Sequence, residues 1–382
     1  MHLRGAVLLV FVLLAVLAPT APPAWARPAQ VGLVSFVGAT TTSLTLSWPK
    51  ASGARGYEIF RSTRRDLPYL TRVKTSTGPT ATVKGMVPGK TYCFQVRARA
   101  GSSFGYKSAR TCKPTIRSQA PVSGPSYSVM TFNVCSSCSG WSSREVAART
   151  VVNARQPDVL ASQEAGVWHT PPSGYTQAFS MSAKRLFYKT ARFTLVSSSG
   201  RPRAGYIEMS DGRYAVWAEL QDMSNGKRLI FVNAHNSSSH ADYARRGREI
   251  DTLLTRMAQI NNAGLEVVYA GDFNSNKSRG TYNESTGFGA EDTVARTFAD
   301  AGYYDAYDLA RTLKRPNWSS AHGFYTTPRV SRTWGDHVDH VFIKPGKANV
   351  WRWMNAALYS GFSYKTPIPS DHSPVQVDLY IP

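Results

Sequence analysis

Residues 228–274, RLIFVNAHNSSSHADYARRGREIDTLLTRMAQINNAGLEVVYAGDFN, decide the fold. The apolar runs at 229–235 and 266–271 are typical of buried strands. Between them, residues 242–261 place apolar side chains along one stripe of a helix: Ile250, Leu253, Leu254, Met257 and Ile260. A strand, a helix lying on a sheet and a second strand therefore follow one another, which predicts a layered α/β fold.

The same alternation extends from residue 126 to residue 382. Further strands are predicted at 127–133, 159–163, 186–188, 214–220, 340–343 and 376–381, and a further helix at 143–154. Strands that alternate with helices, with several hairpin-like pairs among them, indicate an α/β sandwich formed by one domain.

Residues 27–113 have a different pattern, with short alternating strands and no helical stretch between them. Strands are predicted at 43–48, 56–61, 81–84 and 92–98, which indicates an all-β sandwich. Trp48, Tyr57 and the segment VPGKTY (87–92) make this region resemble a fibronectin type III domain, whose immunoglobulin-like sandwich carries no chemistry of its own. Residues 114–125, PTIRSQAPVSGP, are rich in Pro, Ser and Gly and predict an extended linker.

The first 26 residues predict a signal peptide that is removed on export. Arg4 supplies a positive charge, residues 6–17 are apolar, and Ala24-Trp25-Ala26 is an A-x-A cleavage site. The apolar run is shorter than the roughly 20 residues that span a bilayer. We therefore expect a secreted, extracellular protein.

Four cysteines suit an oxidising compartment. Cys93, Cys112, Cys135 and Cys138 allow three pairings, of which Cys93–Cys112 with Cys135–Cys138 is favoured because each pair lies within one domain. A single C-x-x-C supplies two of the four ligands that a structural zinc site needs, so a zinc site is not expected.

In the C-terminal domain, one predicted strand after another meets a polar residue suited to metal or phosphate chemistry. These residues are Asn133, Glu164, His235, Asp272 with Asn274, Asp339, and Asp371 with His372. Sites in open α/β sheets form at strand ends, so we expect these side chains to converge on one cleft.

The segments TFN (131–133), SQE (162–164), NAH (233–235), GDFN (271–274), VDHVF (338–342) and SDHSP (370–374) together resemble the endonuclease/exonuclease/phosphatase superfamily. That resemblance implies a four-layer, DNase I-like α/β sandwich and a metal-dependent phosphoesterase. Nucleases, bacterial sphingomyelinases and inositol polyphosphate phosphatases all belong to this superfamily.

Phosphodiester hydrolysis needs neutralised charge, an activated water and help for the leaving oxygen. Glu164 is the predicted Mg²⁺ ligand, because Mg²⁺ prefers carboxylate oxygen, and Asn133 and Asp371 are predicted to complete the shell directly or through water. Mn²⁺ or Ca²⁺ would suit the same ligands.

Two histidines are the predicted acid–base pair, since imidazole changes charge near neutral pH. The resemblance makes His372 the general base for water and turns His235 toward the scissile phosphate. It also implies that Asp272 orients the water or the metal and that Asp339 accepts a hydrogen bond from one of the histidines. Two more residues are predicted to contact substrate beside Asn133: Asn274 and Arg213.

The net charge of +21 is unevenly distributed along the chain. Residues 27–124 hold 16 Lys and Arg against 2 Asp and Glu, whereas residues 125–382 hold 28 against 22. The β domain is therefore predicted to attach the enzyme to a polyanion, such as nucleic acid, an anionic cell-wall polymer or a membrane surface. We expect a monomer.

The sequence leaves the substrate open. A nuclease acting on DNA or RNA is favoured by export and by the basic charge. A sphingomyelinase or phospholipase C would need an exposed apolar hairpin, for which the aromatic-rich residues 351–362 are a candidate, although core packing explains them equally simply. A phosphatase for small anions would need a dense Lys/Arg cluster, and none is visible. A non-catalytic, polyanion-binding surface protein is the alternative from another class.

Overall fold

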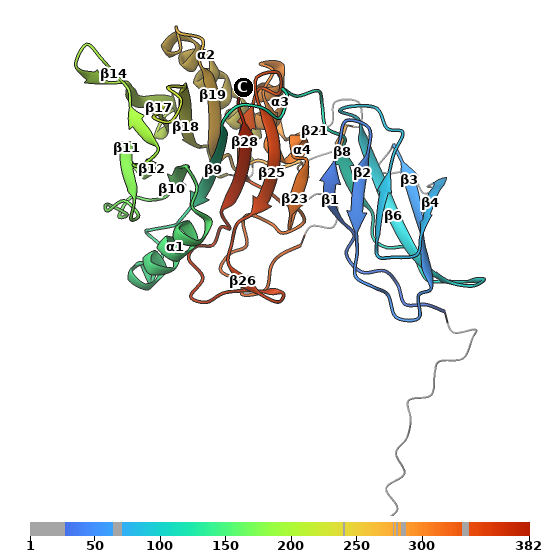
Figure 1. The fold of residues 1–382 in the computed structure, drawn as a ribbon. Helices are drawn as coiled ribbons and strands as arrows, with labels where there is room; N and C mark the ends of the chain where they lie inside the picture. The colour runs from blue at the N-terminus through green and yellow to red at the C-terminus, as the bar shows by residue number, and fades with distance from the viewer. Residues whose placement is uncertain are drawn as a thin grey trace, which may run out of the picture.

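The computed structural model describes residues 27–63, 71–239, 241–277, 279, 282–283, 288–330 and 336–382. The predicted signal peptide at 1–26 lies outside these residues. Figure 1 shows an N-terminal body of strands, in blue and cyan, lying beside a larger body of strands and helices. Among the described residues, no helix is both long enough and apolar enough to span a membrane.

The N-terminal domain is a sandwich of two small sheets, as its alternating pattern predicts. One sheet contains β1 (Ser35–Ala39), β2 (Leu44–Ser47) and β5 (Thr80–Val83). The other contains β3 (Gly56–Ser62), β4 (Thr71–Ser76), β6 (Thr91–Ala100), β7 (Ser103–Phe104) and β8 (Thr111–Pro114). Trp48 and Tyr57 pack edge to face in the core, and the Val87 N–H donates to the Tyr92 hydroxyl at 2.9 Å.

The C-terminal domain contains two larger sheets. The first has the order β11 (Tyr175–Met181), β12 (Lys184–Lys189), β10 (Val159–Gln163), β9 (Ser126–Asn133), β28 (Val375–Tyr380), β25 (Asn349–Asn355) and β23 (Thr312–Lys314). The second has the order β13 (Phe193–Leu195), β17 (Arg213–Asp222), β18 (Arg228–His235), β19 (Glu266–Asp272), β24 (Asp339–Ile343) and β22 (Tyr304–Asp305), with β16 (Ala204–Ser210) beside β17.

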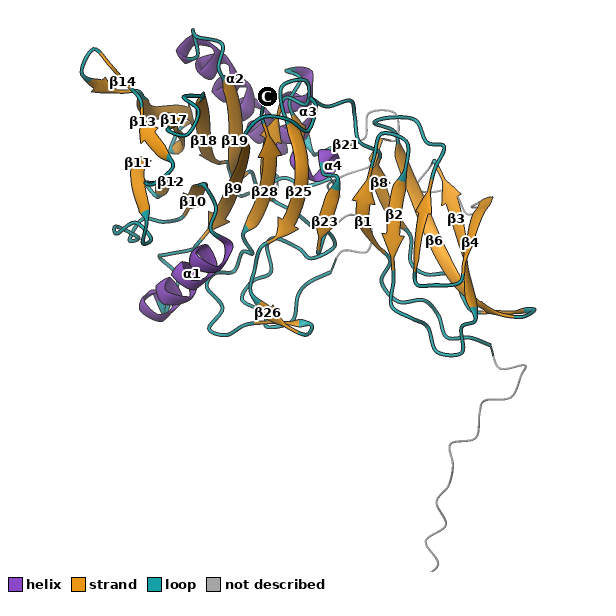
Figure 2. Ribbon diagram, in the orientation of Figure 1, coloured by secondary structure: helices purple, strands orange, loops and turns teal. Residues whose placement is uncertain are grey.

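Helices cover the outer faces of the two sheets (Figure 2). α1 (Trp141–Arg155) packs on the first sheet through Ala148 and Val152, while α2 (Tyr243–Ile260) and α3 (Thr293–Asp300) pack on the second. The short helix α4 (Ala306–Leu309) follows β22, and three small hairpins complete the domain: β14 (Ser197–Ser198) with β15 (Arg201–Pro202), β20 (Tyr282–Asn283) with β21 (Phe288–Gly289), and β26 (Tyr359–Ser360) with β27 (Ser363–Tyr364). The layers run helix, sheet, sheet, helix, so the predicted four-layer α/β sandwich is confirmed.

The alternation of side chains along each strand separates the layers. In β18, Ile230 and Val232 face α2, whereas Phe231 enters the core between the two sheets. In β9, Met130 and Phe132 face α1, whereas Val129 points between the sheets. Because successive side chains point to opposite faces of the sheet, this alternation also fixes the face toward which the last side chain of each strand points.

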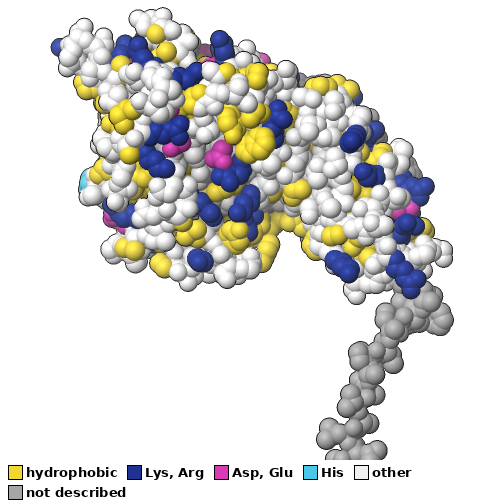
Figure 3. Space-filling view, in the orientation of Figure 1, with side chains coloured by type: hydrophobic (Ala, Val, Ile, Leu, Met, Phe, Trp, Pro, Cys, Tyr) yellow, Lys and Arg dark blue, Asp and Glu magenta, His cyan; other side chains and the backbone are white. Residues whose placement is uncertain are grey.

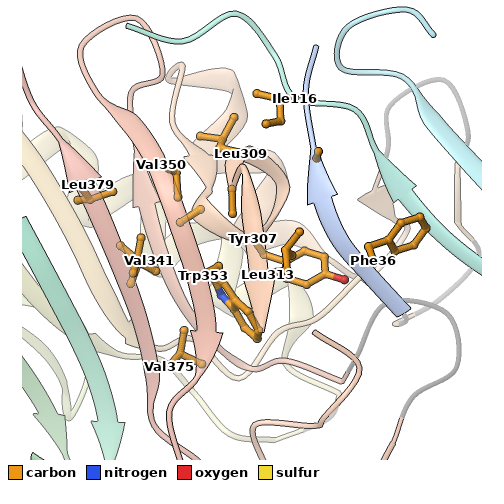
Figure 4. Close-up of a cluster of buried hydrophobic side chains, with 14 of the residues drawn as sticks. Phe36, Ile116, Tyr307, Leu309, Leu313, Val341, Val350, Trp353, Val375 and Leu379 are labelled. Atoms are coloured by element: carbon orange, nitrogen blue, oxygen red, sulfur yellow. The ribbon is translucent and has the colours of Figure 1, made fainter. Parts of the chain in front are cut away.

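The two domains are continuous rather than tethered. β1 pairs with β23 at Gly38 and Thr312, and the Ala39 N–H donates to the Arg311 carbonyl at 2.9 Å. The sheet of β1, β2 and β5 and the first sheet of the C-terminal domain therefore form one continuous ten-stranded sheet. In Figure 4, β1, which carries Phe36, runs alongside Leu313 and Tyr307 of the C-terminal domain. Their buried apolar residues form a single cluster.

The predicted linker at 114–125 does not run free. Ile116 is buried in the shared core, and the Gln119 side chain both donates to the Leu309 carbonyl and accepts from the Val350 N–H, each at 2.7 Å. Apart from Pro114, which ends β8, the segment forms neither helix nor strand, but its Pro, Ser and Gly content does not predict whether it packs against the domains. This segment closes the joint between the domains.

The structure pairs the cysteines as Cys93–Cys112 and Cys135–Cys138. Cys93 and Cys112 are directly opposite each other on β6 and β8. The second disulfide follows Asn133 at the end of β9 and fastens the loop between that strand and α1. Both favoured pairings are therefore present.

Candidate active site

The predicted site residues meet where the strands of both sheets end. Asn133, His235 and Asp272 are the last residues of β9, β18 and β19, and Asp339 is the first residue of β24. Each of these side chains lies on the same face of its strand as one core residue, because an even number of positions separates the two. The core residues are, in the same order, Val129, Phe231, Val268 and Val341, which fill the core between the sheets. The polar residues therefore close the end of that core, at the cleft edge of the sandwich.

Asn133 joins two carboxylates that belong to different sheets. Its Nδ2 group donates to Glu164 Oε1 at 2.9 Å and to Asp272 Oδ2 at 3.0 Å. Its Oδ1 atom accepts from the Cys135 N–H at 3.1 Å. The amide nitrogen of Asn133 thus orients the two carboxylates, while its oxygen accepts one backbone N–H, and its predicted place in the metal shell, directly or through water, stays a prediction.

Two site residues have an uncommon backbone conformation. Glu164 has a φ of 50° and Asn274 a φ of 51°, both in the left-handed region that side chains other than Gly and Asn rarely adopt. The Glu164 carbonyl accepts from both the Ser136 N–H and the Ser136 hydroxyl, which holds the turn in place. Strain of this kind concentrates at functional sites, where surrounding contacts maintain it.

Two overlapping groups of side chains could hold a cation among the described residues. Glu164, His235 and Asp272 form one group, and Asp272, Asp339 and His372 form the other. His235 Nε2 lies 3.5 Å from Asp272 Oδ2 and 3.9 Å from Glu164 Oε1. Two carboxylates held together beside an imidazole repel each other unless a cation lies between them, so this donor set fits a divalent metal ion.

His372 is fixed by Asp339, as the sequence predicts for one of the histidines. Its Nδ1 atom lies 2.9 Å from Asp339 Oδ2, and its Nε2 atom lies 3.9 Å from Asp272 Oδ2. Burial lowers the pKa of His372, but the negative charges of Asp339 and Asp272 outweigh burial and raise that pKa to about 10. The cationic form of this imidazole is therefore stabilised, and it is the favoured form at neutral pH.

His235 behaves differently although it lies in the same site. Burial lowers its pKa, and the opposing effect of the Asp272 and Glu164 carboxylates is too weak to reverse the shift. Burial alone would raise the pKa of Asp272, but the His372 and His235 charges and the Asn133 hydrogen bond lower it instead. The site thus contains one imidazole with a lowered pKa, that of His235, and one with a raised pKa, that of His372.

The other predicted residues are spread around this centre. The Asn274 N–H donates to Asp272 Oδ1 at 3.0 Å, and its side chain donates to the Asn236 carbonyl at 3.2 Å. Asp371 belongs to neither group of candidate ligands in the described chain, and its Oδ1 accepts from the Ser370 hydroxyl at 3.1 Å. The role of Asp371 as a metal ligand, direct or through water, therefore stays a prediction.

Several residues that the sequence did not single out support the site. Gln163 Nε2 donates to Asn233 Oδ1 at 2.7 Å, which ties β10 of one sheet to β18 of the other two residues before His235. His340, next to Asp339, faces the opposite side and bonds Asp305 through Nδ1 at 2.8 Å. Lys184, at the start of β12, is buried beside Glu164. Strand alternation could have flagged Gln163 and Asn233, but no local pattern points to Lys184.

The fold and this site define a class of α/β phosphoesterases, and the family comparison agrees. Residues 130–372 match the endonuclease/exonuclease/phosphatase family, and residues 29–112 match the fibronectin type III domain. The chain belongs to the endonuclease/exonuclease/phosphatase family, with a fibronectin type III domain at its N-terminal side.

Solved structures with the same fold come from bacteria and from man. An endonuclease/exonuclease/phosphatase family protein from Bacteroides thetaiotaomicron is 18% identical, with a TM-score of 0.51 over 67% of this chain and 98% of its own. A mannosyl-6-phosphatase from the same organism is 17% identical, with a TM-score of 0.51 over 67% of this chain and all of its own. The human Nocturnin catalytic domain, solved with a bound sulfate anion, is 19% identical, with a TM-score of 0.50 over 68% of this chain and 94% of its own.

One curated relative is much longer than the matching region. Chitinase A1 from Niallia circulans is 31% identical over 119 residues, which is 30% of this chain and 14% of the chitinase. The match is consistent with a fibronectin type III domain.

Proposed function

We propose that this protein is an exported, Mg²⁺-dependent phosphoesterase that hydrolyses phosphodiester bonds, with nucleic acid as its favoured substrate. The observation that carries the proposal is the meeting of Glu164, Asp272 and His235 with the His372–Asp339 pair at the end of both sheets. Mn²⁺ or Ca²⁺ suits the same oxygen ligands.

Glu164 and Asp272 are the residues that would hold the metal ion, with Asn133 keeping their carboxylates in place. A bound divalent ion supplies positive charge to the phosphate oxygens, and that charge stabilises the transition state.

His372 acts on the attacking water. Its Nδ1 atom is hydrogen-bonded to Asp339, which leaves Nε2 on the side of Asp272 to take a proton. Because its pKa is raised to about 10, the His372 imidazole must first lose a proton, and a divalent ion held by Glu164 and Asp272 would favour this loss by offsetting their negative charge. As the water oxygen then forms its bond to phosphorus, the water proton passes to the neutral Nε2 and the bond from phosphorus to the leaving oxygen breaks. Asp339 and Asp272 stabilise the imidazolium that results.

His235 and Asn274 are proposed to contact the phosphate itself. Burial keeps the His235 imidazole neutral, so it donates one N–H to a phosphate oxygen without adding a second cation beside His372. Asn274 is held by the Asn236 carbonyl at the same strand end. Fixed donors of this kind stabilise developing negative charge because they need no reorganisation during the reaction.

Charge supports a polyanionic substrate. The face in Figure 3 carries Lys and Arg side chains over both domains, in keeping with the net charge of +21. Because the β domain is joined to the catalytic domain through β1 and β23, the excess of 14 positive charges over residues 27–124 would stay at a fixed position relative to the site. A nucleic acid long enough to reach both domains would be held by both.

A lipid substrate is the second candidate, because an apolar hairpin lies near the cleft edge. Phe362, in the turn between β26 and β27, is 53% exposed, and Val146 on α1 is 64% exposed. Other residues of the aromatic-rich segment at 351–362 differ in their exposure. Trp353 and Met354 are buried in the core, whereas Trp351 is half exposed.

A substrate panel tests the proposal. Plasmid nicking would be measured with Mg²⁺ and with EDTA, beside hydrolysis of sphingomyelin and of bis-p-nitrophenyl phosphate. We expect Mg²⁺-dependent nicking that EDTA abolishes. Hydrolysis of sphingomyelin alone would favour the lipid candidate, and no metal-dependent hydrolysis of any substrate would leave a non-catalytic, polyanion-binding role.

A further inference from the structure

Lys184 places a buried positive charge in the wall of the proposed active site. It is the first residue of β12, and it shares the inward-facing positions of Leu186 and Tyr188, which lie in the core between the sheets. The adjacent Ala183 carbonyl accepts from the Ala165 N–H at 2.8 Å, next to Glu164. Only 4% of Lys184 is exposed, so its ammonium lies among the site residues.

Arg213, at the start of β17, lies on the same side of the site. The structure gives both side chains an electrostatic interaction with His235 and with each other. Burial, together with the Arg213 charge, lowers the pKa of Lys184 to about 8, while Glu164 opposes the shift. Within the described chain, neither the Lys184 ammonium nor the Arg213 guanidinium donates a hydrogen bond or forms an ion pair of its own.

Lys184 Nζ lies 5.5 Å from the centre of the Tyr214 ring, but an aromatic face does not neutralise its charge. Two neighbouring cations without an ion-pair partner among the described residues are costly, since buried charges are normally paired. Glu164 is the one carboxylate that acts on Lys184, and it is already engaged by Asn133 and assigned to a metal ion. Metal binding would leave the two cations still less compensated. An anion bound between them would remove the repulsion, and phosphate oxygens suit both ammonium and guanidinium donors.

We propose that Lys184 and Arg213 form a binding position for a second phosphate charge beside the scissile bond, so that the site selects substrates with more than one negative charge there. This inference rests on the proposed function and names its substrate class. Lys184 and Arg213 are 29 positions apart in the sequence, and the packing of the sheet that contains β12 against the sheet that contains β17 brings them together. The pair supplies the cationic cluster that the sequence did not reveal.

The second charge has two possible sources. It belongs either to the scissile group itself, as in a phosphomonoester, or to a neighbouring phosphate, as in a nucleotide chain. Two pairs of substrates separate them: p-nitrophenyl phosphate against bis-p-nitrophenyl phosphate for the first, and the thymidine dinucleotide with a 5′-phosphate against the same dinucleotide without it for the second.

The experiment measures kcat/KM for both pairs in the wild-type chain, in Lys184→Met and in Arg213→Met. We expect the wild type to prefer the more highly charged member of at least one pair, and we expect each variant to lower that preference at least ~10-fold. Arg201→Met is the matched control, because Arg201 is an exposed cation on β15, away from the site. It should keep the wild-type preference.

A binding measurement separates this inference from the proposed function. Titration calorimetry with inorganic phosphate, in EDTA, should show binding to the wild type and to Arg201→Met, and at least ~10-fold weaker binding to Lys184→Met and Arg213→Met. Circular dichroism checks that each variant folds, and Arg213→Met, which alters a partly exposed side chain, serves if Lys184→Met does not.

The outcomes are distinct. If the wild type hydrolyses nothing, the proposed function fails, and phosphate binding that depends on Lys184 and Arg213 still supports the second binding position. If the wild type hydrolyses phosphoesters and the folded variants keep its charge preference and its phosphate affinity, the second binding position is wrong and the proposed function stands.

Discussion

His372 Nδ1 lies 2.9 Å from Asp339 Oδ2, although the two residues are 33 positions apart; His372 precedes β28 of the first sheet, and Asp339 begins β24 of the second. The other oxygen of Asp339, Oδ1, has no hydrogen-bond partner in the described chain. Among side chains, the buried Asp339 carboxylate therefore forms its hydrogen bond with the imidazole ring of His372.

Asp339→Asn should lower kcat/KM by about 10²-fold or more, because the amide can no longer fix the tautomer of His372 or stabilise its cation. Steady-state kinetics on the substrate that the panel identifies would measure the loss. Asp378→Asn, which alters a partly exposed carboxylate paired with Arg352, is the matched control and should retain activity. Wild-type rates in a folded Asp339→Asn chain would contradict the proposed role of the pair.

Glu164→Gln should lower activity by about 10²-fold or more and should also weaken metal binding, because it removes one of two adjacent carboxylates. Thermal unfolding with and without Mg²⁺ would measure binding independently of turnover, since a ligand that binds the folded state raises Tm. We expect Mg²⁺ to raise the Tm of the wild type more than that of the variant. Equal shifts in both proteins would exclude Glu164 as a ligand.

Gly271→Ala should destabilise the fold by about 3 kcal/mol or more. A Cβ atom at Gly271 would lie 2.2 Å from the Ala234 carbonyl oxygen, where β18 passes the end of β19 one residue before Asp272. Denaturant unfolding would measure the loss. Gly346→Ala is the control, because a Cβ there meets no atom within 4 Å, and it should change stability by well under 1 kcal/mol.

His340 should contribute more to stability at acidic than at alkaline pH. Burial lowers its pKa, but Asp305 at 2.8 Å outweighs burial and raises that pKa from 6.5 to about 9. A folded-state pKa above the unfolded value gives a contribution that is complete below about pH 6.5 and disappears as the pH rises through about 9.

The matching experiment compares wild type with His340→Gln by urea unfolding across that range. The variant should lose on the order of 2 kcal/mol near pH 6, and the difference should shrink by pH 10. A difference that grows with pH would show that the ion pair with Asp305 is not the source of the stability.

The two domains should unfold together. Lys113 on β8 is fully buried, and its ammonium donates to the Tyr307 carbonyl of the catalytic domain at 2.6 Å. Lys113→Ala removes that bond and leaves a cavity at the joint, so it should cost about 2–4 kcal/mol. Scanning calorimetry should show one transition at a lower temperature, whereas Lys50→Ala, on the exposed surface, should leave the transition in place. Two separate transitions in the wild type would show that the domains are independent.

Most of the fold could be predicted from the sequence, because the strand and helix periods are strong where an element is buried on one side. The predicted strand at 159–163 matches β10 residue for residue, and the predicted helix at 242–261 differs from α2 by one residue at each end. β11, β16 and α3 were missed because their apolar positions are few or interrupted by polar residues that lie at the surface. The pairing of β1 with β23 could not be predicted from the sequence, because the paired residues are far apart in the chain.

The site was predictable where residues stand in short segments at strand ends, as for Glu164, His235 and Asp272. The orientation of a side chain was not. Asn133 turns its nitrogen toward the carboxylates, and Asp371 bonds its neighbour Ser370, because hydrogen bonds that form only in the folded chain decide both. Lys184 carries no signal of its own, since a lysine at the start of a strand is ordinarily solvated, and its burial depends on packing between two sheets.

The pairing of β1 with β23 covers a sheet edge that could otherwise pair with a strand of another molecule. β23 would otherwise be the last strand of its sheet, with unpaired N–H and C=O groups beside the apolar Leu313, and such open borders recruit strands from other molecules. Instead, β1 of the N-terminal domain pairs with that edge strand within the same chain. A catalytic domain cut away from it would expose a template for self-association, so the β domain protects the enzyme from aggregation whatever else it binds.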